Sequence, residues 1–337
     1  MNIALIGIGM VAETHINAIK KSSHGLRLCG VLGRDAAKTA QFAAIHKTHA
    51  FPSIDAIALD PSVDVVIIAT PPDARLEAAQ KLASAGKPIL LEKPIERTLN
   101  AAREIVEICE KARVPLGVVF QHRVRAASIA LKETLASKRL GTIVSVEIRV
   151  PWWRDQAYYD VQGRGTYARD GGGVMISQAI HTLDLAHWLL GPIITVQAMM
   201  RRTALHHLEA EDWTGALLEF DCGAVGTLMA TTAAFPGGAE TIALQGTKGA
   251  ALLGEGILTL TDLNGETEVF GASATTGGGS DPMGFTHAWH QSVIEDFADA
   301  IAQGRPPLIP AREALLTHAV IDAMERASKS GQRTEVN

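Results

Sequence analysis

The chain has 337 residues, a formal net charge of −5 and a hydrophobic fraction of 47%. Its length allows two domains with a sizeable core, and its slightly acidic balance argues against a nucleic-acid-binding surface, which needs a basic face. No apolar run approaches the roughly 18 residues of a membrane span, and the first residues lack the pattern of a signal peptide. The cysteines, Cys29, Cys109 and Cys222, lie far apart, so we expect neither a disulfide framework nor a zinc site, and a cytoplasmic location.

Residues 1–120 alternate short apolar runs with helical patterns. Strands are expected at 3–6, 26–32, 63–69, 89–91 and 116–120. Alternation of strand and helix with short loops predicts a parallel sheet that is covered by helices on both faces. The sequence therefore predicts an α/β domain over residues 1–120.

After about residue 121 the pattern changes to a series of strands. Turn signals at 221–223 and 264–265 separate paired apolar runs, as in hairpins. This pattern predicts a second domain, of α+β type, over residues 121–337, with a large and mostly antiparallel sheet. The expected strands are 143–150, 214–220, 224–230, 241–245, 250–253, 257–261 and 267–270, and helices are expected near 178–190, 288–303 and 311–329.

The first predicted strand leads into a G-x-G-x-x-A pattern that opens a helix. In such a turn the first glycine permits the tight bend, the second lets the backbone approach a pyrophosphate, and the small last residue allows close packing of helix and strand. The helix N-terminus adds N–H groups and a positive dipole for the phosphates. The pattern predicts a Rossmann-type dinucleotide site formed by Gly7, Gly9, Met10, Val11 and Ala12.

The end of the second predicted strand bears on which dinucleotide binds. Gly33 stands where an acidic residue usually binds the ribose hydroxyls of NAD, and Arg34 follows it. The missing carboxylate removes repulsion against a 2′-phosphate, and an arginine can pair with one. These residues favour NADP over NAD. The alternative is that Asp35 serves as the ribose ligand for NAD, although its position also suits the N-cap of the next helix.

Three further stretches occur in an order that resembles one known family: ATPPDARLEAAQKLASAGKPILLEKP at 69–94, FQHR at 120–123 and GGGVMISQAIHTLDLAHWLLG at 171–191. Over essentially its whole length the chain resembles the Gfo/Idh/MocA oxidoreductases. The resemblance implies NAD(P)-dependent hydride transfer to or from sugars, sugar acids or cyclitols. It also implies a C-terminal domain whose open sheet commonly carries subunit contacts, and hence a homodimer or homotetramer.

The resemblance also assigns roles to particular residues. Lys93 matches the family's lysine beside the nicotinamide, which would polarise the reacting oxygen. His181 matches the catalytic histidine, a residue type whose pKa near neutrality suits a general base or acid. Further contacts to the cofactor are expected from Thr70, Pro71, Glu92, Lys93 and Arg123.

The chain departs from the family pattern at two positions. Ser177 stands four residues before His181, where many members have an aspartate, and Arg75 stands where a histidine often follows the TPP turn. Both differences concern substrate identity more than the redox chemistry. Ser177 is still expected in the substrate site, since its hydroxyl can donate or accept a hydrogen bond. Asp184 either touches the substrate or forms a salt bridge.

The stretch 152–170 is rich in aromatic and polar side chains. Flat aromatic rings beside forked polar groups suit a sugar ring, and they are also enriched at subunit interfaces, so both interpretations stay open. The predicted substrate contacts here are Trp153, Arg154, Tyr158 and Arg164.

No metal site is expected. The histidines at 206–207 and at 287 and 290 lack acidic or cysteine partners at ligand spacing along the chain. Two alternatives to a dehydrogenase stay open: a glycosidase that retains its NAD, and a cofactor-sensing protein without catalysis. The sequence therefore predicts an NAD(P)-dependent oxidoreductase with a small-molecule substrate and no nucleic-acid or membrane partner.

Overall fold

The computed structural model describes residues 1–275, 277–279, 281 and 283–337. The chain divides into two compact units, residues 1–121 with 286–315, and residues 122–285 with 316–337. In this division residues 286–315 join the first unit, whereas the sequence assigned them to a second domain over 121–337. The reason is that helix α9 (Ala288–Gln303) packs on helix α1 (Ala12–Lys21), where the ring of His290 meets the ring of His15.

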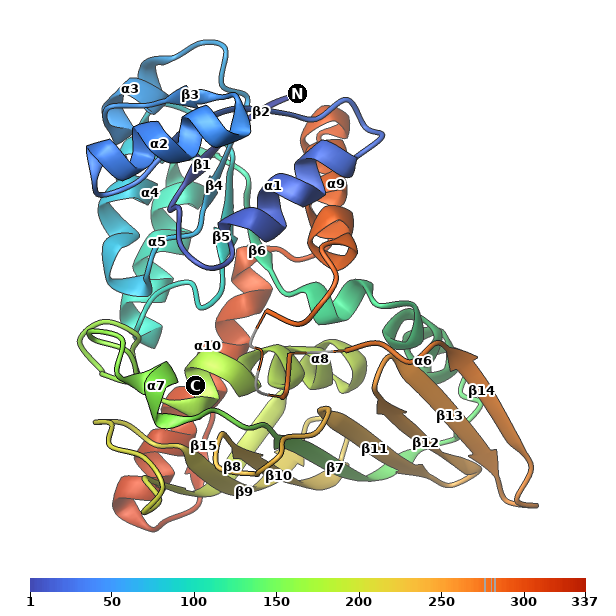
Figure 1. Cartoon of the computed structure of the whole chain (residues 1–337). Helices are drawn as coiled ribbons and strands as arrows, with labels where there is room; N and C mark the ends of the chain where they lie inside the picture. Colours follow the sequence, from blue (N-terminus) through green and yellow to red (C-terminus); the bar gives the residue numbers. More distant parts are fainter. Residues whose placement is uncertain (276, 280, 282) are drawn as a thin grey trace. The chain divides into compact units, whose positions relative to one another are not determined.

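The first unit is built on a parallel sheet with the strand order β3-β2-β1-β4-β5-β6 among its described residues (Figure 1). The chain order places helices between these strands, as expected, while β3 and α3 were not predicted. The strands are β1 (Asn2–Ile6), β2 (Arg27–Leu32), β3 (His49–Ala50), β4 (Val65–Ile68), β5 (Ile89–Glu92) and β6 (Leu116–Val119). The helices, besides α1 and α9, are α2 (Ala36–His46), α3 (Ile54–Leu59), α4 (Leu76–Ser84) and α5 (Leu99–Ala112).

Every residue of the strands β4, β5 and β6 is buried. Continuous apolar runs of this kind are typical of parallel strands that are covered on both faces. The strand order reverses at β1, which has β2 on one side and β4 on the other. In open α/β sheets, ligands bind outside the carboxyl ends of the strands at such a switch point. The residues that follow β1, β4 and β5 are therefore the expected positions of a ligand site.

The second unit contains a sheet of nine strands among its described residues, in the order β14-β13-β12-β11-β7-β10-β9-β8-β15 (Figure 1). All pairs are antiparallel except β7 with β10, which confirms the expected mostly antiparallel sheet. Strands β8 and β15 were not predicted. The strands are β7 (Ile143–Pro151), β8 (Ile193–Arg201), β9 (Trp213–Phe220), β10 (Val225–Thr231), β11 (Thr241–Gly246), β12 (Gly249–Gly254), β13 (Ile257–Asp262), β14 (Thr267–Gly271) and β15 (Thr334–Glu335).

Helices cover one face of this sheet. Helix α6 (Ala126–Ala136) packs on β12, β13 and β14, and helix α8 (Ile180–Leu190) packs on β7 and β11 (Figure 1). A π-helical turn, Met175–Ala179, leads directly into α8. The other elements are the short helix α7 (Gln156–Tyr159) and helix α10 (Ala311–Ser330), most of which belongs to this unit.

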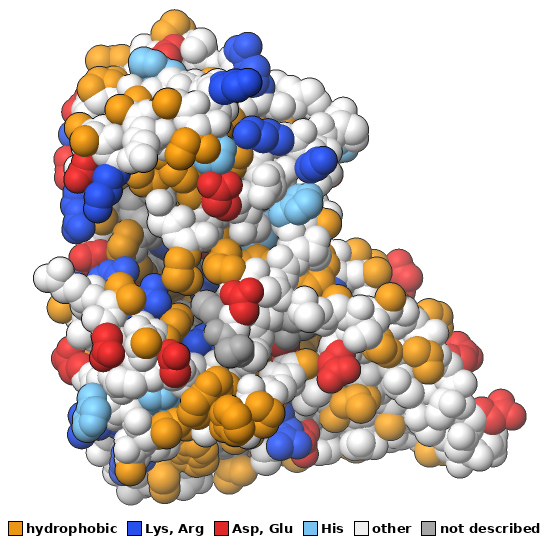
Figure 2. Space-filling view, in the orientation of Figure 1, with side chains coloured by type: hydrophobic (Ala, Val, Ile, Leu, Met, Phe, Trp, Pro, Cys, Tyr) orange, Lys and Arg blue, Asp and Glu red, His pale blue; other side chains and the backbone are white. Residues whose placement is uncertain are grey.

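Apolar side chains also reach the surface of the second unit, where Figure 2 shows them gathered in patches. On three neighbouring strands, Met199, Leu217 and Val225 are each more than half exposed. The alternation of side chains along a strand explains this exposure. On the opposite face of the same sheet, Leu218 of β9 and Leu228 of β10 are buried in the core. None of the described helices has the length and hydropathy that a membrane span requires.

Candidate functional site

The turn after β1 has the geometry that the glycine pattern predicts. Gly7 has a φ of +105°, and a Cβ there would lie 2.6 Å from the carbonyl of Ala69, so only glycine fits. No atom lies within 4 Å of a Cβ built on Gly9, so its backbone is open to a close-approaching group. Helix α1 starts at Ala12 without a side-chain cap on its first turn. The predicted set Gly7 to Ala12 therefore forms a strand–turn–helix corner that can receive a pyrophosphate on backbone N–H groups.

The structure gives Gly33 a second reason to be glycine. A Cβ at this position would lie 2.7 Å from both Ile8 Cδ1 and Thr39 Oγ1, so a side chain here would require Ile8 and Thr39 to shift. Arg34 is exposed. Asp35 caps α2, since its carboxylate accepts a hydrogen bond of 3.0 Å from the N–H of Lys38, and this bond lowers the pKa of Asp35. The interpretation of Asp35 as a helix cap is confirmed.

Lys93 follows β5 directly, at the carboxyl end of the sheet, and is half-buried. Its own N–H donates to Glu92 Oε2 over 3.2 Å. The other carboxylate oxygen of Glu92 lies 2.9 Å from His15 Nε2 and 3.5 Å from His290 Nε2. Burial alone would raise the pKa of Glu92, but the hydrogen bonds from the two histidines hold it well below the usual range. Internal partners thus account for the carboxylate that the family resemblance assigned to the cofactor.

The grouping of His15, Glu92 and His290 was not visible in the sequence. His290 was set aside as a metal ligand because no acidic or cysteine partner stands at ligand spacing along the chain, and the fold brings Glu92 next to it. One ligand atom from each of the three buried residues lies within 4.8 Å of the others. The same groups thus have the type and proximity of a metal-ligand set, and they are also joined by hydrogen bonds.

Arg75 connects the turn after β4 with the turn after β5. The side chain is 3% exposed, and burial lowers its pKa to about 10. Its Nε and Nη2 donate to the carbonyl of Thr70 over 3.0 and 2.6 Å. Its Nη1 donates to the carbonyls of Glu92 and Pro94. Arg75 is therefore internal, and it ties the predicted cofactor residues Thr70 and Pro71 to the Lys93 turn.

In the second unit, His181 lies in the first turn of α8, immediately after the π-helical turn that contains Ser177. The side chain is almost fully buried, with 6% of its surface exposed. Its ring stacks on that of His122, with a centroid distance of 4.9 Å and an interplanar angle of 21°. The sequence did not predict His122 as a neighbour, although it stands beside Arg123 in the FQHR motif.

Arg123 and Asp184 form a bidentate ion pair with distances of 2.8 Å and 2.7 Å. Their side chains are 2% and 0% exposed. Of the two alternatives for Asp184, the structure thus shows the salt bridge. The partner of Asp184 is Arg123, which was predicted as a contact of the cofactor. The pair fixes α8 to the 3₁₀ turn Gln121–Val124 that carries His122. Burial, and then the charge of Arg123, lowers the pKa of His187 on the same helix to about 4.

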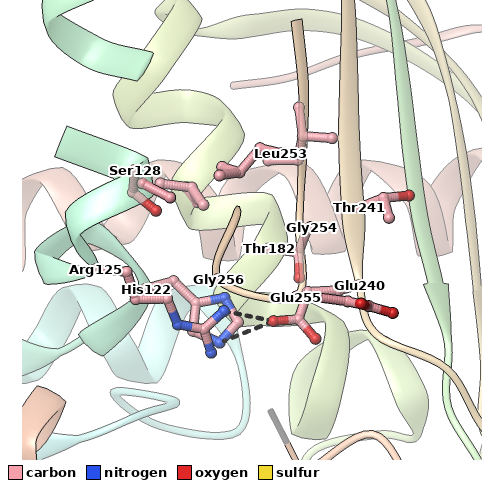
Figure 3. A pocket seen from close by; sticks show the side chains of 13 residues that line it. His122, Arg125, Ser128, Thr182, Glu240, Thr241, Leu253, Gly254, Glu255 and Gly256 are labelled. Carbon is pink, nitrogen blue, oxygen red and sulfur yellow. Dashed lines mark hydrogen bonds and ion pairs between the residues drawn. The ribbon is translucent and has the colours of Figure 1, made fainter. Parts of the chain in front are cut away.

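A narrow cavity with both polar and apolar lining residues adjoins His122 (Figure 3). Glu240 lies in its wall, 2.5 Å from Arg125 Nη1 and 3.8 Å from His122 Nε2, as the dashed lines in Figure 3 mark. Trp152 Nε1 donates to the other carboxylate oxygen of Glu240 over 3.3 Å. The buried carboxylate of Glu240 thus lies next to the stacked rings of His122 and His181. The chain has Ser177 where many family members have an aspartate, so the carboxylate near these rings comes from a different segment.

Glu211 holds the start of the π-helical turn. Its two carboxylate oxygens accept hydrogen bonds from the backbone N–H groups of Gly173 and Met175, over 3.1 and 3.0 Å. Burial raises the pKa of Glu211 to about 7, against the opposing effect of these hydrogen bonds. Glu211 lies in the connection between β8 and β9, far along the chain, and no motif marked it.

The aromatic stretch has two kinds of residue. Arg154 is internal, since it is 3% exposed and donates to the carbonyls of Trp153, Gly277 and Gly279. Tyr158 is partly exposed, with the guanidinium of Arg164 stacked 4.2 Å above its ring. Gln178 of the π-helical turn donates to the Tyr158 hydroxyl over 3.1 Å, so this stretch touches the segment that precedes His181.

Trp153, the remaining predicted contact of this stretch, packs edge-on against Phe235, which is 77% exposed. The two rings form a T-shaped pair with a centroid distance of 5.2 Å. An exposed aromatic residue beside a partly exposed tryptophan suits a substrate surface and a subunit contact equally.

The fold and these residues define a dinucleotide-binding oxidoreductase with a separate α+β domain, and comparisons with known proteins agree. Residues 1–120 match the model of the oxidoreductase family with an NAD-binding Rossmann fold, and residues 129–252 match the GFO/IDH/MocA C-terminal domain. The chain belongs to the Gfo/Idh/MocA family and is an NAD(P)-dependent oxidoreductase of the kind that acts on CH–OH groups.

The chain is also similar to several named proteins. It is 28% identical to D-apiose dehydrogenase of Rhizobium rhizogenes over 99% of this chain and 96% of that protein. It is 30% identical to inositol 2-dehydrogenase 2 of Saccharopolyspora erythraea over 66% of this chain and 64% of that protein. Among solved structures, WlbA dehydrogenase from Bordetella pertussis, in complex with NADH and UDP-GlcNAcA, superposes with a TM-score of 0.85 at 26% identity, covering 100% of this chain and 98% of that one.

Proposed function

We propose that this protein is a dehydrogenase that transfers a hydride between NADP and a secondary alcohol of a sugar, sugar acid or cyclitol. His181 exchanges the hydroxyl proton as general base or acid, and Lys93 polarises the reacting oxygen. The observation that carries the proposal is the position of Lys93. It follows the carboxyl end of β5, two strands from the cradle strand β1, where ligands bind in such sheets.

The general chemistry of lysine and histidine side chains suits these two roles. An ammonium beside the reacting oxygen stabilises the negative charge that develops when the hydroxyl loses its proton. A histidine can hold that proton near neutral pH, where neither of its states is strongly favoured. The nicotinamide of the bound dinucleotide would supply the hydride acceptor, and the turn from Gly7 to Ala12 would hold the pyrophosphate of the same cofactor. Named relatives that act on inositol and on apiose support a polyhydroxylated substrate.

The preference for NADP is supported by Arg34 and Asp35. Arg34 is exposed beside the cradle, and the Asp35 carboxylate is engaged as the cap of α2. A charge-assisted hydrogen bond from Arg34 to a 2′-phosphate would favour NADP, and no carboxylate at residue 33 repels that phosphate.

We further propose a homodimer or homotetramer that forms through the uncovered face of the second sheet. Exposed Met199, Leu217 and Val225 support this, because exposed apolar residues on neighbouring strands are typical of interfaces. We place the enzyme in the cytoplasm, since the three cysteines are free thiols. Light scattering of the purified protein, with Leu217→Lys as the variant, tests the assembly.

The function is tested by following absorbance at 340 nm with a panel of sugars, sugar acids and inositols and with both cofactors. Sustained reduction of NADP by one class of compound supports the proposal. Hydrolysis of a glycoside without net cofactor turnover would identify the NAD-retaining glycosidase instead. Tight NADP binding with no reaction on any compound would favour a cofactor sensor.

A further inference from the structure

We propose that Arg75 is a positioning residue for Lys93, which it holds through the backbone on both sides of the lysine. This inference rests on the proposed function, in which Lys93 meets the reacting oxygen. Arg75 contacts the backbone of this turn: its Nη1 donates to the carbonyls of Glu92 and Pro94, the residues immediately before and after Lys93.

The remaining contacts of the guanidinium anchor it to the neighbouring strand. Nε and Nη2 both donate to the carbonyl of Thr70, which follows β4. Within the described residues, the four hydrogen bonds of Arg75 therefore all run to backbone carbonyls, and they join the carboxyl ends of β4 and β5. The rigid, planar fork of an arginine can reach several carbonyls at once, which a lysine ammonium on a flexible stem does less well.

Burial of this side chain has to be offset by its contacts. A guanidinium that is 3% exposed has lost its hydration, and no carboxylate forms a bidentate pair with it among the described residues. The carbonyl bonds are its compensation, so they constrain its position strongly. The guanidinium in turn restrains the positions of the carbonyls of Thr70, Glu92 and Pro94.

The side chain of Glu92 supplies a second constraint on the same turn. Its carboxylate accepts the Lys93 N–H and also contacts His15 on α1 and His290 on α9. The backbone on each side of Lys93 is thus held, while the lysine side chain remains half-buried and able to reach a ligand. Loss of Arg75 should release the carbonyl side of the turn and leave the Glu92 side intact.

The chain contains a matched control for this arrangement. Lys87 precedes β5, and its Nζ donates to the carbonyls of Asp60 and Val63 over 2.6 and 2.8 Å. It therefore also joins β4 and β5 through cation–carbonyl bonds, but at the amino ends of the strands. If Arg75 only held the sheet together, its loss would resemble the loss of Lys87.

The experiment compares Arg75→Met, Arg75→Lys and Lys87→Met, using the compound that gives the fastest NADP reduction in the 340 nm screen. Arg75→Met should lower kcat by about 10–100-fold, the usual consequence of a displaced catalytic group, with KM for NADP within about threefold of wild type. Arg75→Lys, which retains the charge without the fork, should fall between wild type and Arg75→Met. Lys87→Met should lower the melting temperature and leave kcat unchanged.

The decisive measurement adds Arg75→Met to Lys93→Met. If Arg75 acts through Lys93, the double variant should turn over no more slowly than Lys93→Met alone. A full additional loss in the double variant, or a folded Arg75→Met or Arg75→Lys enzyme with wild-type kcat, overturns the inference alone. Wild-type turnover in Lys93→Met would instead overturn the proposed function.

Discussion

The Lys93 turn and the His181 segment hold their reactive side chains by different means. At the Lys93 turn the backbone is fixed, by Arg75 and by Glu92, and the side chain is left half-buried. At the His181 segment the side chain itself is packed, stacked on His122 and 6% exposed. Neighbours of Lys93 should therefore act through backbone geometry, and neighbours of His181 through buried charge and packing.

The strongest test of this difference concerns the buried ion pair beside His181. Asp184→Ala leaves Arg123 buried without its carboxylate, which should lower the free energy of unfolding by about 3–5 kcal/mol. Urea denaturation of the protein without cofactor measures this. The control is Arg312→Ala in the first unit, whose pair with Glu110 is about half exposed on both sides and should contribute less than about 1 kcal/mol. Equal losses of unfolding free energy in the two variants would contradict the prediction that the buried Arg123–Asp184 pair stabilises the protein more than the exposed pair does.

The second prediction is that both regions are needed for turnover. Lys93→Met and His181→Ala should each lower kcat by about 100-fold or more, the usual contribution of an acid, base or electrostatic group. The dissociation constant for NADP should change little, because the cradle does not depend on either side chain. Fluorescence titration with NADPH and steady-state rates provide the two measurements. Turnover near wild type in both variants would remove the proposed mechanism.

The third prediction uses the Glu211 carboxylate that holds the π-helical turn. Its pKa is raised from 4.5 to about 7 in the folded protein, so between these values the folded state retains a proton that the unfolded state has lost. Stability from this group is thus present at low pH and lost as pH rises through about 7. Between about pH 5.5 and pH 8 the loss should be roughly 2 kcal/mol.

Glu211→Gln mimics the protonated carboxyl and should remove this pH dependence. The measurement is the difference in unfolding free energy between wild type and Glu211→Gln across that pH range. The unfolding free energy of Glu211→Gln should rise relative to that of the wild type as pH increases. Parallel curves would show that burial does not raise the pKa of Glu211 in the protein.

The smallest expected effect concerns cofactor choice, at Arg34 in the first unit, away from both regions. Arg34→Ala should weaken NADP binding by about tenfold, the lower end for a charge-assisted hydrogen bond at an exposed site, and leave NAD binding unchanged. Isothermal titration with each cofactor measures this. Introducing aspartate at residue 33 is a poorer test, because a Cβ there collides with Ile8 and Thr39. Tighter binding of NAD than NADP by the wild type would contradict the assignment of Arg34.

The sequence by itself determined the parts of this protein that depend on neighbours along the chain. The cradle from Gly7 to Ala12, the cap at Asp35 and the strand that ends at Lys93 are each set by a few consecutive residues. Strand β8 escaped prediction because its burial pattern, with Ile194, Gln197 and Met199 exposed, follows no strict alternation. Helix α9 was predicted at its observed bounds, but its packing on α1 was not predicted, because the two helices lie near opposite ends of the chain.

Only the tertiary structure decided which side chains meet. The pairs Arg123 with Asp184, His122 with His181 and Glu92 with His290 join residues far apart in the chain, and each residue taken alone has an ordinary local pattern. The physical reason is that a hydrogen bond or ring contact depends on positions in space to within a fraction of an ångström, and packing of the elements fixes those positions. Residue type limits what Arg75 can bind, but only the packing of β4 against β5 brings the carbonyls of Thr70, Glu92 and Pro94 within its reach.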